Sequence, residues 1–130
     1  MSKRENISSG SSFEAKFGYS RAVKVGDMVF VSGTVGIDYQ TGTTPPTPEG
    51  QLRQIIRNME PALAKAGAKL SDIVQITTYV TSPEVFQTIG PVLGEIFGDI
   101  RPTNAALVVA FPVPDVVVEI SATAVIGCGD

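Results

Sequence analysis

One acidic side chain, Glu119, stands within an apolar stretch, residues 116–126, that the sequence predicts to be a β-strand. The alternation of a strand places Glu119, Ser121 and Thr123 on one face and the aliphatic residues between them on the other. Burial raises the pKa of an unpaired carboxyl group, whereas a nearby cation lowers it. Glu119 is therefore either ion-paired or suited to proton transfer, and it is the first candidate catalytic residue.

The residue types that the chain lacks narrow its chemistry. The sequence has no histidine, which removes Ser/His and Cys/His catalysis and the commonest zinc and iron ligands. Its one cysteine, Cys128, cannot form an internal disulfide and stands in a Gly-Cys-Gly stretch that is typical of a frayed end rather than of a nucleophile. Acid–base chemistry must therefore come from Asp, Glu, Lys, Tyr or water.

The elements that would position Glu119 are expected in the order β-β-α-β-α-β-β. A Gly-Asp pair at 26–27 predicts a hairpin, three- and four-residue apolar spacing predicts the first helix, and Ser-Pro at 82–83 begins the second. A Gly-Pro pair at 90–91 is expected to interrupt that second helix, and prolines at 112 and 114 bracket a turn. The expected strands are residues 22–25, 28–32, 73–81, 104–110 and 116–126, and the expected helices are residues 49–66 and 83–97.

This order predicts an α+β fold, a single domain over residues 1–130 in which two helices cover one face of a mainly antiparallel sheet. The predicted strands nevertheless carry apolar residues on both faces, more than a half-solvated sheet needs. An apolar face of that size seldom stays in water. We therefore expect a homo-oligomer with pockets at the subunit boundaries.

Composition excludes several classes of partner. The chain has 130 residues and a hydrophobic fraction of 43%, which suits one globular core. Its net charge is −3 and its ten basic residues are scattered, so no nucleic-acid partner is expected. The apolar runs are too short to cross a membrane and residues 1–10 have no signal-peptide core, so we expect no membrane partner and a cytoplasmic location.

Three segments carry a resemblance to a known family: FGYSRAVKVGDMVFVSG, QLRQIIRNMEPALAKAGAKLSDIVQITTYVTSPEVF and RPTNAALVVAFPVPDVVVEISATA. In this order they resemble the Rid (YjgF, L-PSP) family over nearly the whole chain. The resemblance implies a chorismate-mutase-like fold and a homotrimer with a small central barrel and small-molecule sites in the clefts between subunits. Many members hydrolyse reactive enamines and imines made by pyridoxal-phosphate enzymes, releasing ammonia and a 2-keto acid. No cofactor and no metal are implied.

The resemblance also implies roles for individual residues. Tyr19 matches the family's cleft tyrosine, and Ser32 with Gly33 matches its strand-end Ser-Gly pair. Glu119 matches the acidic residue that orients or activates the water attacking the C=N carbon. The substrate would lie among these residues, and the remaining binding positions are 104 and 106.

The chain departs from the family at these last two positions. Asn104 stands where deaminating members have an arginine that clamps the substrate carboxylate, and Ala106 stands where many have cysteine. Losing a charged hydrogen-bond partner in a dry cleft costs about 2 to 5 kcal/mol, and a neutral amide cannot replace a bidentate guanidinium. Two arginines could restore the charge. Arg21 shares a face with Tyr19 if that segment is extended, and Arg101 precedes Asn104 by three residues.

Two functions therefore stay open. One is a hydrolase or deaminase acting on a small C=N compound, and the other is a binding protein that keeps the cleft but performs no chemistry. A ribonuclease, the family's older label, is disfavoured by the acidic balance and the missing histidine. Structural roles are the alternatives for single residues: Glu119 pairing with a cation of a neighbouring subunit, Tyr19 packing at an interface, Ser32-Gly33 ending a strand and Asn104 capping a backbone group.

Overall fold

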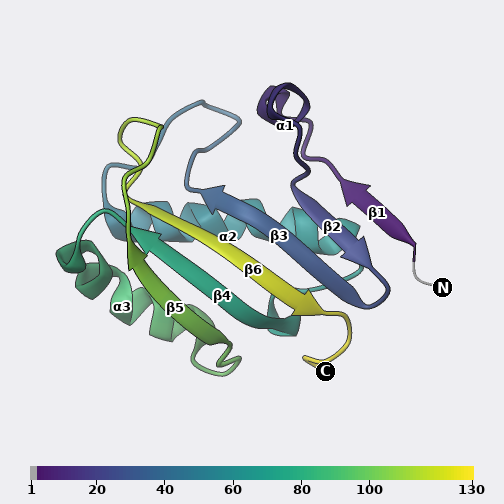
Figure 1. Cartoon of the computed structure of the whole chain (residues 1–130). Helices are drawn as coiled ribbons and strands as arrows, with labels where there is room; N and C mark the ends of the chain where they lie inside the picture. The colour runs from purple at the N-terminus through teal and green to yellow at the C-terminus, as the bar shows by residue number, and fades with distance from the viewer. Residues whose placement is uncertain (1–2) are drawn as a thin grey trace.

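The computed structural model describes residues 3–130, which form one six-stranded sheet in the order β1-β2-β3-β6-β4-β5. The elements are β1 (Arg4–Ile7), α1 (Ser12–Phe17), β2 (Ala22–Val25), β3 (Met28–Val35), α2 (Pro48–Lys65), the short 3-10 helix η1 (Leu70–Asp72), β4 (Ile73–Val80), α3 (Pro83–Phe97), β5 (Thr103–Val108) and β6 (Val118–Val125). Strands β4 and β5 run parallel, and the other neighbouring pairs are antiparallel. Helices α2 and α3 lie behind one face of the sheet (Figure 1). The predicted α+β class with a mainly antiparallel sheet is therefore confirmed.

Helix α2 begins and ends where its sequence predicts. The Thr47 hydroxyl accepts a hydrogen bond from the Gly50 amide at 3.0 Å, which caps the N-terminus. At the other end Gly67 has a φ of 85°, and the Ala68 amide bonds back to the Leu63 carbonyl at 2.9 Å. The apolar face between these caps is fully buried at Leu52, Ile55, Met59 and Leu63. No helix within residues 3–130 combines the length and the apolar character needed to span a bilayer.

Helix α3 runs from Pro83 to Phe97 without a break, so the predicted interruption at Gly90-Pro91 is wrong. Its apolar residues Ile89, Val92 and Phe97 are buried on both sides of that pair. Burial of a continuous apolar stripe supplies most of a helix's stability in a protein. That burial outweighs the hydrogen bond lost at the proline.

Two N-terminal elements were not predicted. Strand β1 extends the sheet by pairing with β2, and α1 follows it. Three of the four β1 residues are exposed and polar, so the segment has no apolar alternation to reveal it. Helix α1 has only six residues, too few for a periodic signal. Strand β3 is also longer than predicted and continues past Ser32 to Val35.

The prediction for β6 is confirmed, because buried and partly buried residues alternate along the whole strand. Its buried residues face the helices, and Glu119, Ser121 and Thr123 face the other way. The strand does not pair with β5, which precedes it in sequence, because β4 lies between them. The proline-bracketed segment at 112–114 therefore connects strands that are not neighbours (Figure 1).

The face of the sheet away from the helices exposes large apolar side chains, as the sequence predicts. Met28 and Phe30 pair with Val125 and Thr123 on this face and are 42% and 44% exposed, and Leu107 is 49% exposed. A fully solvated face would favour polar residues at such positions. The single chain therefore leaves an apolar surface uncovered.

A buried glutamine, Gln51, connects two loops next to the sheet through hydrogen bonds. Gln51 of α2 donates through Nε2 to the carbonyls of Pro45 at 3.0 Å and Asp115 at 2.8 Å. Its Oε1 accepts from the Val117 amide at 3.0 Å. One side chain that is 2% exposed thus ties the loop before α2 to the entrance of β6. Gly36 lies directly against the Gln51 backbone, where a Cβ would be 2.4 Å from the Gln51 carbonyl oxygen.

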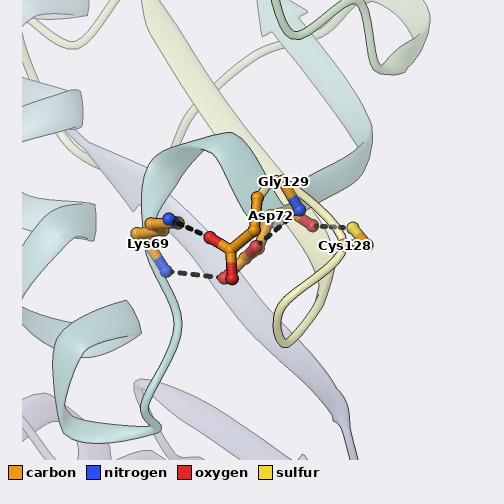
Figure 2. Close-up of polar contacts among 5 residues, drawn as sticks. Lys69, Asp72, Cys128 and Gly129 are labelled. Atoms are coloured by element: carbon orange, nitrogen blue, oxygen red, sulfur yellow. Dashed lines mark hydrogen bonds and ion pairs between the residues drawn. The ribbon is translucent and has the colours of Figure 1, made fainter.

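The C-terminal residues are fastened by Asp72, at the end of η1 (Figure 2). Its two carboxylate oxygens accept the amides of Lys69 at 3.0 Å and Gly129 at 2.9 Å. The Cys128 thiol donates to the Asp72 carbonyl at 3.4 Å, and the Lys69 ammonium pairs with Asp130. The predicted frayed end is therefore wrong. Three interactions, made by the Gly129 amide, the Cys128 thiol and the Asp130 carboxylate, hold the last residues against η1.

Candidate functional site

The centre of the candidate site is an irregularity in the β3–β6 ladder. Val31 pairs with Ala122 and Thr34 pairs with Ile120, so Ser32 and Gly33 together stand opposite one residue of β6. Two residues against one is the geometry of a β-bulge, a feature that often re-aims side chains near active sites. The Ser-Gly pair predicted from the sequence is thus a bulge within β3 rather than the end of the strand.

Gly33 lets the Glu119 side chain pack directly on the strand backbone. A Cβ at Gly33 would lie 2.5 Å from the Glu119 Oε1 atom and 2.8 Å from its Cδ atom. Such distances are far inside van der Waals contact, so any other residue would displace the carboxylate. A glycine here permits a close approach to the backbone, and the group that approaches is the carboxylate of Glu119.

Glu119 is partly buried and is not ion-paired within residues 3–130, where the ion pairs are Arg53–Glu95 and Lys69–Asp130. Burial raises the pKa of its carboxyl group, and the positive charge of Arg21 only partly opposes that rise. A carboxyl group with a raised pKa and no partner holds a proton more readily than an ordinary carboxylate and is suited to proton exchange. This is the environment that the sequence predicts for a proton-transfer residue.

Arg21 lies beneath the same bulge. It is only 6% exposed, its Nη2 donates to the Gly33 carbonyl at 2.7 Å, and its Cζ lies 5.9 Å from the centroid of the Tyr19 ring. A guanidinium over an aromatic face is a favourable cation–π contact. Tyr19 itself is 43% exposed. The expectation that Arg21 and Tyr19 lie together is confirmed.

Ser32 completes this group through the backbone. Its amide donates to the Arg21 carbonyl at 3.0 Å, and its hydroxyl donates to the Ser20 carbonyl at 2.6 Å. These two bonds fix the bulge against the segment that carries Tyr19 and Arg21. The hydroxyl proton is used, so Ser32 has only oxygen lone pairs to offer a ligand. Five of the predicted residues, Tyr19, Arg21, Ser32, Gly33 and Glu119, therefore come together in one chain.

The other two predicted residues lie elsewhere. In β5, Asn104 and Ala106 pair with Ile76 and Thr78 of β4. In β6, Glu119 pairs with Tyr79, which lies on the opposite face of β4 from Ile76 and Thr78. Both residues therefore sit on the helix side of the edge strand β5. The Asn104 Oδ1 accepts a hydrogen bond from the Thr78 hydroxyl at 3.0 Å. Asn104 also lines a cavity of about 340 Å³ together with Arg101, beside α3.

Glu14, which is buried next to this group, was not predicted as a site residue. Its carboxylate accepts hydrogen bonds from the Ser8 hydroxyl at 3.0 Å and the Ser9 amide at 3.2 Å. Burial acts to raise its pKa, but bonds from Ser9 and Ser8 and the charge of Arg21 outweigh that effect and lower it. Glu14 thus stays ionised and anchors the N-terminal segment. Within residues 3–130 no three acidic or cysteine side chains gather as a metal site would require.

The fold as a whole is similar to that of known structures. A member of the YjgF/YER057c/UK114 family from Mycobacterium tuberculosis superimposes with a TM-score of 0.85 at 39% identity, covering 95% of this chain and all 100% of that one. The YjgF protein of Escherichia coli gives a TM-score of 0.82 at 29% identity, covering 93% and 98% of the two chains. The chain therefore has the fold of the YjgF-like class of proteins.

Sequence comparison gives the family. The model described as Endoribonuclease L-PSP matches residues 9–126. A RutC family protein of Pyrococcus abyssi is 36% identical over 82% of this chain and 84% of its own length. A protein of Dermatophagoides farinae named 2-iminobutanoate/2-iminopropanoate deaminase is 31% identical over 83% of this chain and 85% of its own. The chain belongs to the Rid (YjgF, L-PSP) family, as its sequence segments predict.

Proposed function

We propose that this protein is a cytoplasmic hydrolase that deaminates a small, reactive imine or enamine, with Glu119 positioning the attacking water. The observation that carries the proposal is the Glu119 carboxylate, packed on Gly33 with a pKa raised by burial and without an ion pair in residues 3–130. The family relative named as an iminobutanoate and iminopropanoate deaminase supports the reaction class.

The proposed chemistry needs one carboxylate and one water. Glu119 accepts a proton from water as the oxygen bonds to the carbon of the protonated imine, whose C=N π electrons move to nitrogen to give a neutral carbinolamine. The carboxylic acid then gives that proton to the amine nitrogen. As the C–N bond breaks and ammonia leaves, the carboxylate takes the hydroxyl proton, so the carbonyl forms, and Glu119 finally passes this proton to the ammonia. A raised carboxyl pKa helps both steps, because the same group must accept and donate a proton.

The proposed cleft is completed by a second copy of the chain in a homotrimer. Asn104 and Ala106 lie on the helix side of β5, whereas Glu119 lies on the other face of the sheet two strands away. A substrate that contacts both sets of residues therefore requires β5 from a neighbouring subunit. The uncovered face exposes Met28, Phe30 and Leu107, and burying these apolar side chains would favour association of subunits.

The substrate need not carry a carboxylate bound in the manner usual for the family. Asn104 offers no charge, and Arg21 already donates to the Gly33 carbonyl. Arg101 is the better replacement, since it is exposed and lines the same cavity as Asn104. The alternative is a non-catalytic binding protein. It is favoured by Asn104, whose amide oxygen is already occupied by the Thr78 hydroxyl.

The deciding experiment measures ammonia release from freshly generated 2-iminopropanoate by wild type, Glu119→Gln and Asn104→Arg. Glu60→Gln is the matched control, because it makes the same change at an exposed carboxylate of α2. Deaminase function requires wild-type activity that Glu119→Gln reduces by about 100-fold or more while Glu60→Gln does not. Light scattering of each variant separates a catalytic loss from a lost trimer.

Two other outcomes decide against parts of the proposal. Activity in Asn104→Arg alone would mean that the fold can support the reaction but that this chain serves another ligand, which is the binding alternative. A loss of assembly in Glu119→Gln would assign that carboxylate to a subunit contact. A monomeric wild type at micromolar concentration would remove the two-copy cleft.

A further inference from the structure

Arg21 is a buried cation that forms no ion pair at close range. The residue is only 6% exposed, and neither of the ion pairs within residues 3–130 includes it. In the same part of the chain its Nε atom is a buried donor without a hydrogen-bond partner. Moving a charged group out of water without pairing it is costly. The position of this arginine therefore needs a physical reason.

The side chain and the backbone of Arg21 both hold the bulge of β3. Its Nη2 donates to the Gly33 carbonyl at 2.7 Å, and its own carbonyl accepts the Ser32 amide at 3.0 Å. Glu119 packs on the same glycine, where a Cβ would lie 2.5 Å from the carboxylate oxygen Oε1. Arg21 therefore fixes the piece of backbone against which the Glu119 carboxylate rests.

The charge of Arg21 also acts on that carboxylate. Burial raises the pKa of Glu119, and the positive charge of Arg21 opposes this rise. Strand β6 lies between β3 and β4, and none of the three strands contains a lysine or arginine. Their one other titratable group is Tyr79, which pairs with Glu119. The nearest strands thus offer Glu119 no alternative cation.

Other titratable groups surround Arg21 itself. Its charge helps to lower the pKa of Glu14 in α1, and it opposes the burial that raises the pKa of Tyr39 in the loop after β3. The Tyr19 ring lies 5.9 Å from its guanidinium carbon. The charged residues that line a cavity beside it are Asp38, Arg57 and Lys65. The charge of Arg21 therefore acts on two carboxylates, Glu14 and Glu119, and both must be followed when it is removed.

Arg21 is poorly placed to bind the substrate itself. Its side chain is buried, its Nη2 already donates to Gly33, and its Nε is shielded from solvent. A guanidinium held in this way does not suit the role of a clamp for a carboxylate in the cleft. Its effect on a reaction would instead pass through Gly33 and Glu119.

We propose that Arg21 is a positioning residue for the deamination, which holds the Ser32–Gly33 bulge beneath the Glu119 carboxylate and keeps that carboxylate ionised between turnovers. This inference rests on the proposed function. The bulge sets where the carboxylate lies relative to the attacking water, and a small displacement of a catalytic group can cost most of its effect. The guanidinium favours the charged form of Glu119, which is the form that accepts a proton from water.

The test compares two replacements of Arg21. Arg21→Gln removes the charge, whereas Arg21→Lys keeps a charge but cannot reproduce the planar guanidinium. Arg53→Gln is the matched control, because it removes one positive charge from an exposed position of α2. Light scattering and urea unfolding establish that each variant is assembled and folded.

Two readouts are followed against pH. The first is ammonia release from freshly generated 2-iminopropanoate, which gives kcat and KM. The second is the NMR shift of the carboxyl carbon of Glu119 in protein labelled at glutamate, assigned with Glu119→Gln. The second readout needs no turnover, and it follows Glu14 in the same spectra.

We expect Arg21→Gln to lower kcat by about 10-fold or more and to leave KM nearly unchanged. The Glu119 titration and the acid limb of kcat should both move to higher pH, because burial then acts without an opposing cation. Arg21→Lys should keep the wild-type titration but lose kcat, since it holds the bulge less well. Arg53→Gln should match wild type in both readouts.

Several results would overturn the inference. One is a Glu119 titration that does not move in Arg21→Gln, or that moves equally in Arg53→Gln. Another is a raised KM with an unchanged kcat, which would make Arg21 a substrate contact. If Arg21→Gln does not fold, a wild-type kcat in Arg21→Lys would refute the role in holding the bulge. A wild type that releases no ammonia would refute the proposed function, and the Glu119 titration would still decide whether Arg21 controls that carboxylate.

Discussion

Replacing Asp72 with asparagine should destabilise the protein in a pH-dependent way. The Asp72 side chain is 1% exposed, and its two oxygens accept the Lys69 and Gly129 amides (Figure 2). An asparagine keeps one acceptor oxygen but turns an NH₂ group toward the other amide. The variant therefore loses one charge-assisted bond and buries unpaired donors, a cost of about 2 to 4 kcal/mol in unfolding free energy at pH 7.

The sign of the pH dependence follows from the pKa of Asp72. Burial acts to raise that pKa, but the backbone amides of Gly129, Lys69 and Gly127 outweigh it, so the folded-state pKa lies below the unfolded value. The stabilisation is therefore complete above the unfolded pKa of about 3.9 and is lost as the pH falls through the folded pKa. The difference between wild type and Asp72→Asn should shrink over that acidic range.

Urea unfolding at equal protein concentration, at pH 7 and at successively lower pH, measures this difference. Asp130→Asn is the control, because its ion pair with Lys69 is solvent-exposed and should contribute little. The reasoning fails if Asp72→Asn unfolds within about 0.5 kcal/mol of wild type at pH 7. It also fails if the difference between the two proteins does not change with pH.

Further predictions concern packing around α2 and α3. Gln51→Leu should lower the unfolding free energy by about 2 to 4 kcal/mol, because three backbone groups lose their bonds to a buried side chain, whereas the half-exposed Gln54→Leu should change it little; urea unfolding of both tests this. Gly36→Ala should cost about 3 kcal/mol or more, since its Cβ would meet the Gln51 backbone at 2.4 Å and backbone cannot move aside; near-wild-type stability would contradict the close contact. Gly90→Ala should instead raise the melting temperature, because no atom lies within 4 Å of its Cβ and alanine favours a helix by about 0.5 to 1 kcal/mol.

The sequence predicted those parts of the fold whose signal is local and periodic. The alternation along β6 fixed the direction of Glu119, and the apolar spacing of α2 gave its buried face. The break expected at Gly90-Pro91 is wrong because that prediction considered only the hydrogen bond lost at the proline. Burial of apolar residues on both sides of the pair keeps α3 continuous. Local rules describe the chain well only where packing agrees with them.

The candidate site likewise combines residues that the sequence predicts with contacts that only the folded chain shows. The sequence singled out Gly33 and Glu119, but their contact depends on pairing between strands that are distant in the chain. No local pattern reveals that Ser32 and Gly33 form a bulge, or that Glu14 is buried beside Arg21. Those features arise from the register of β3 on β6 and from a short helix with no periodic signal.

The placement of Asn104 links the proposed reaction to the proposed assembly. Glu119 and the exposed apolar residues Met28 and Phe30 share one face of the sheet, whereas Asn104 looks toward the helices from the β5 edge. In the proposed trimer, a neighbouring subunit that covers this apolar face and supplies its β5 edge to the cleft would also dehydrate the Glu119 carboxylate further. Because desolvation is the largest cause of the raised Glu119 pKa, association would raise that pKa beyond its value in the single chain. In the proposed enzyme, therefore, subunit association would supply both the missing side of the cleft and part of the driving force for proton transfer.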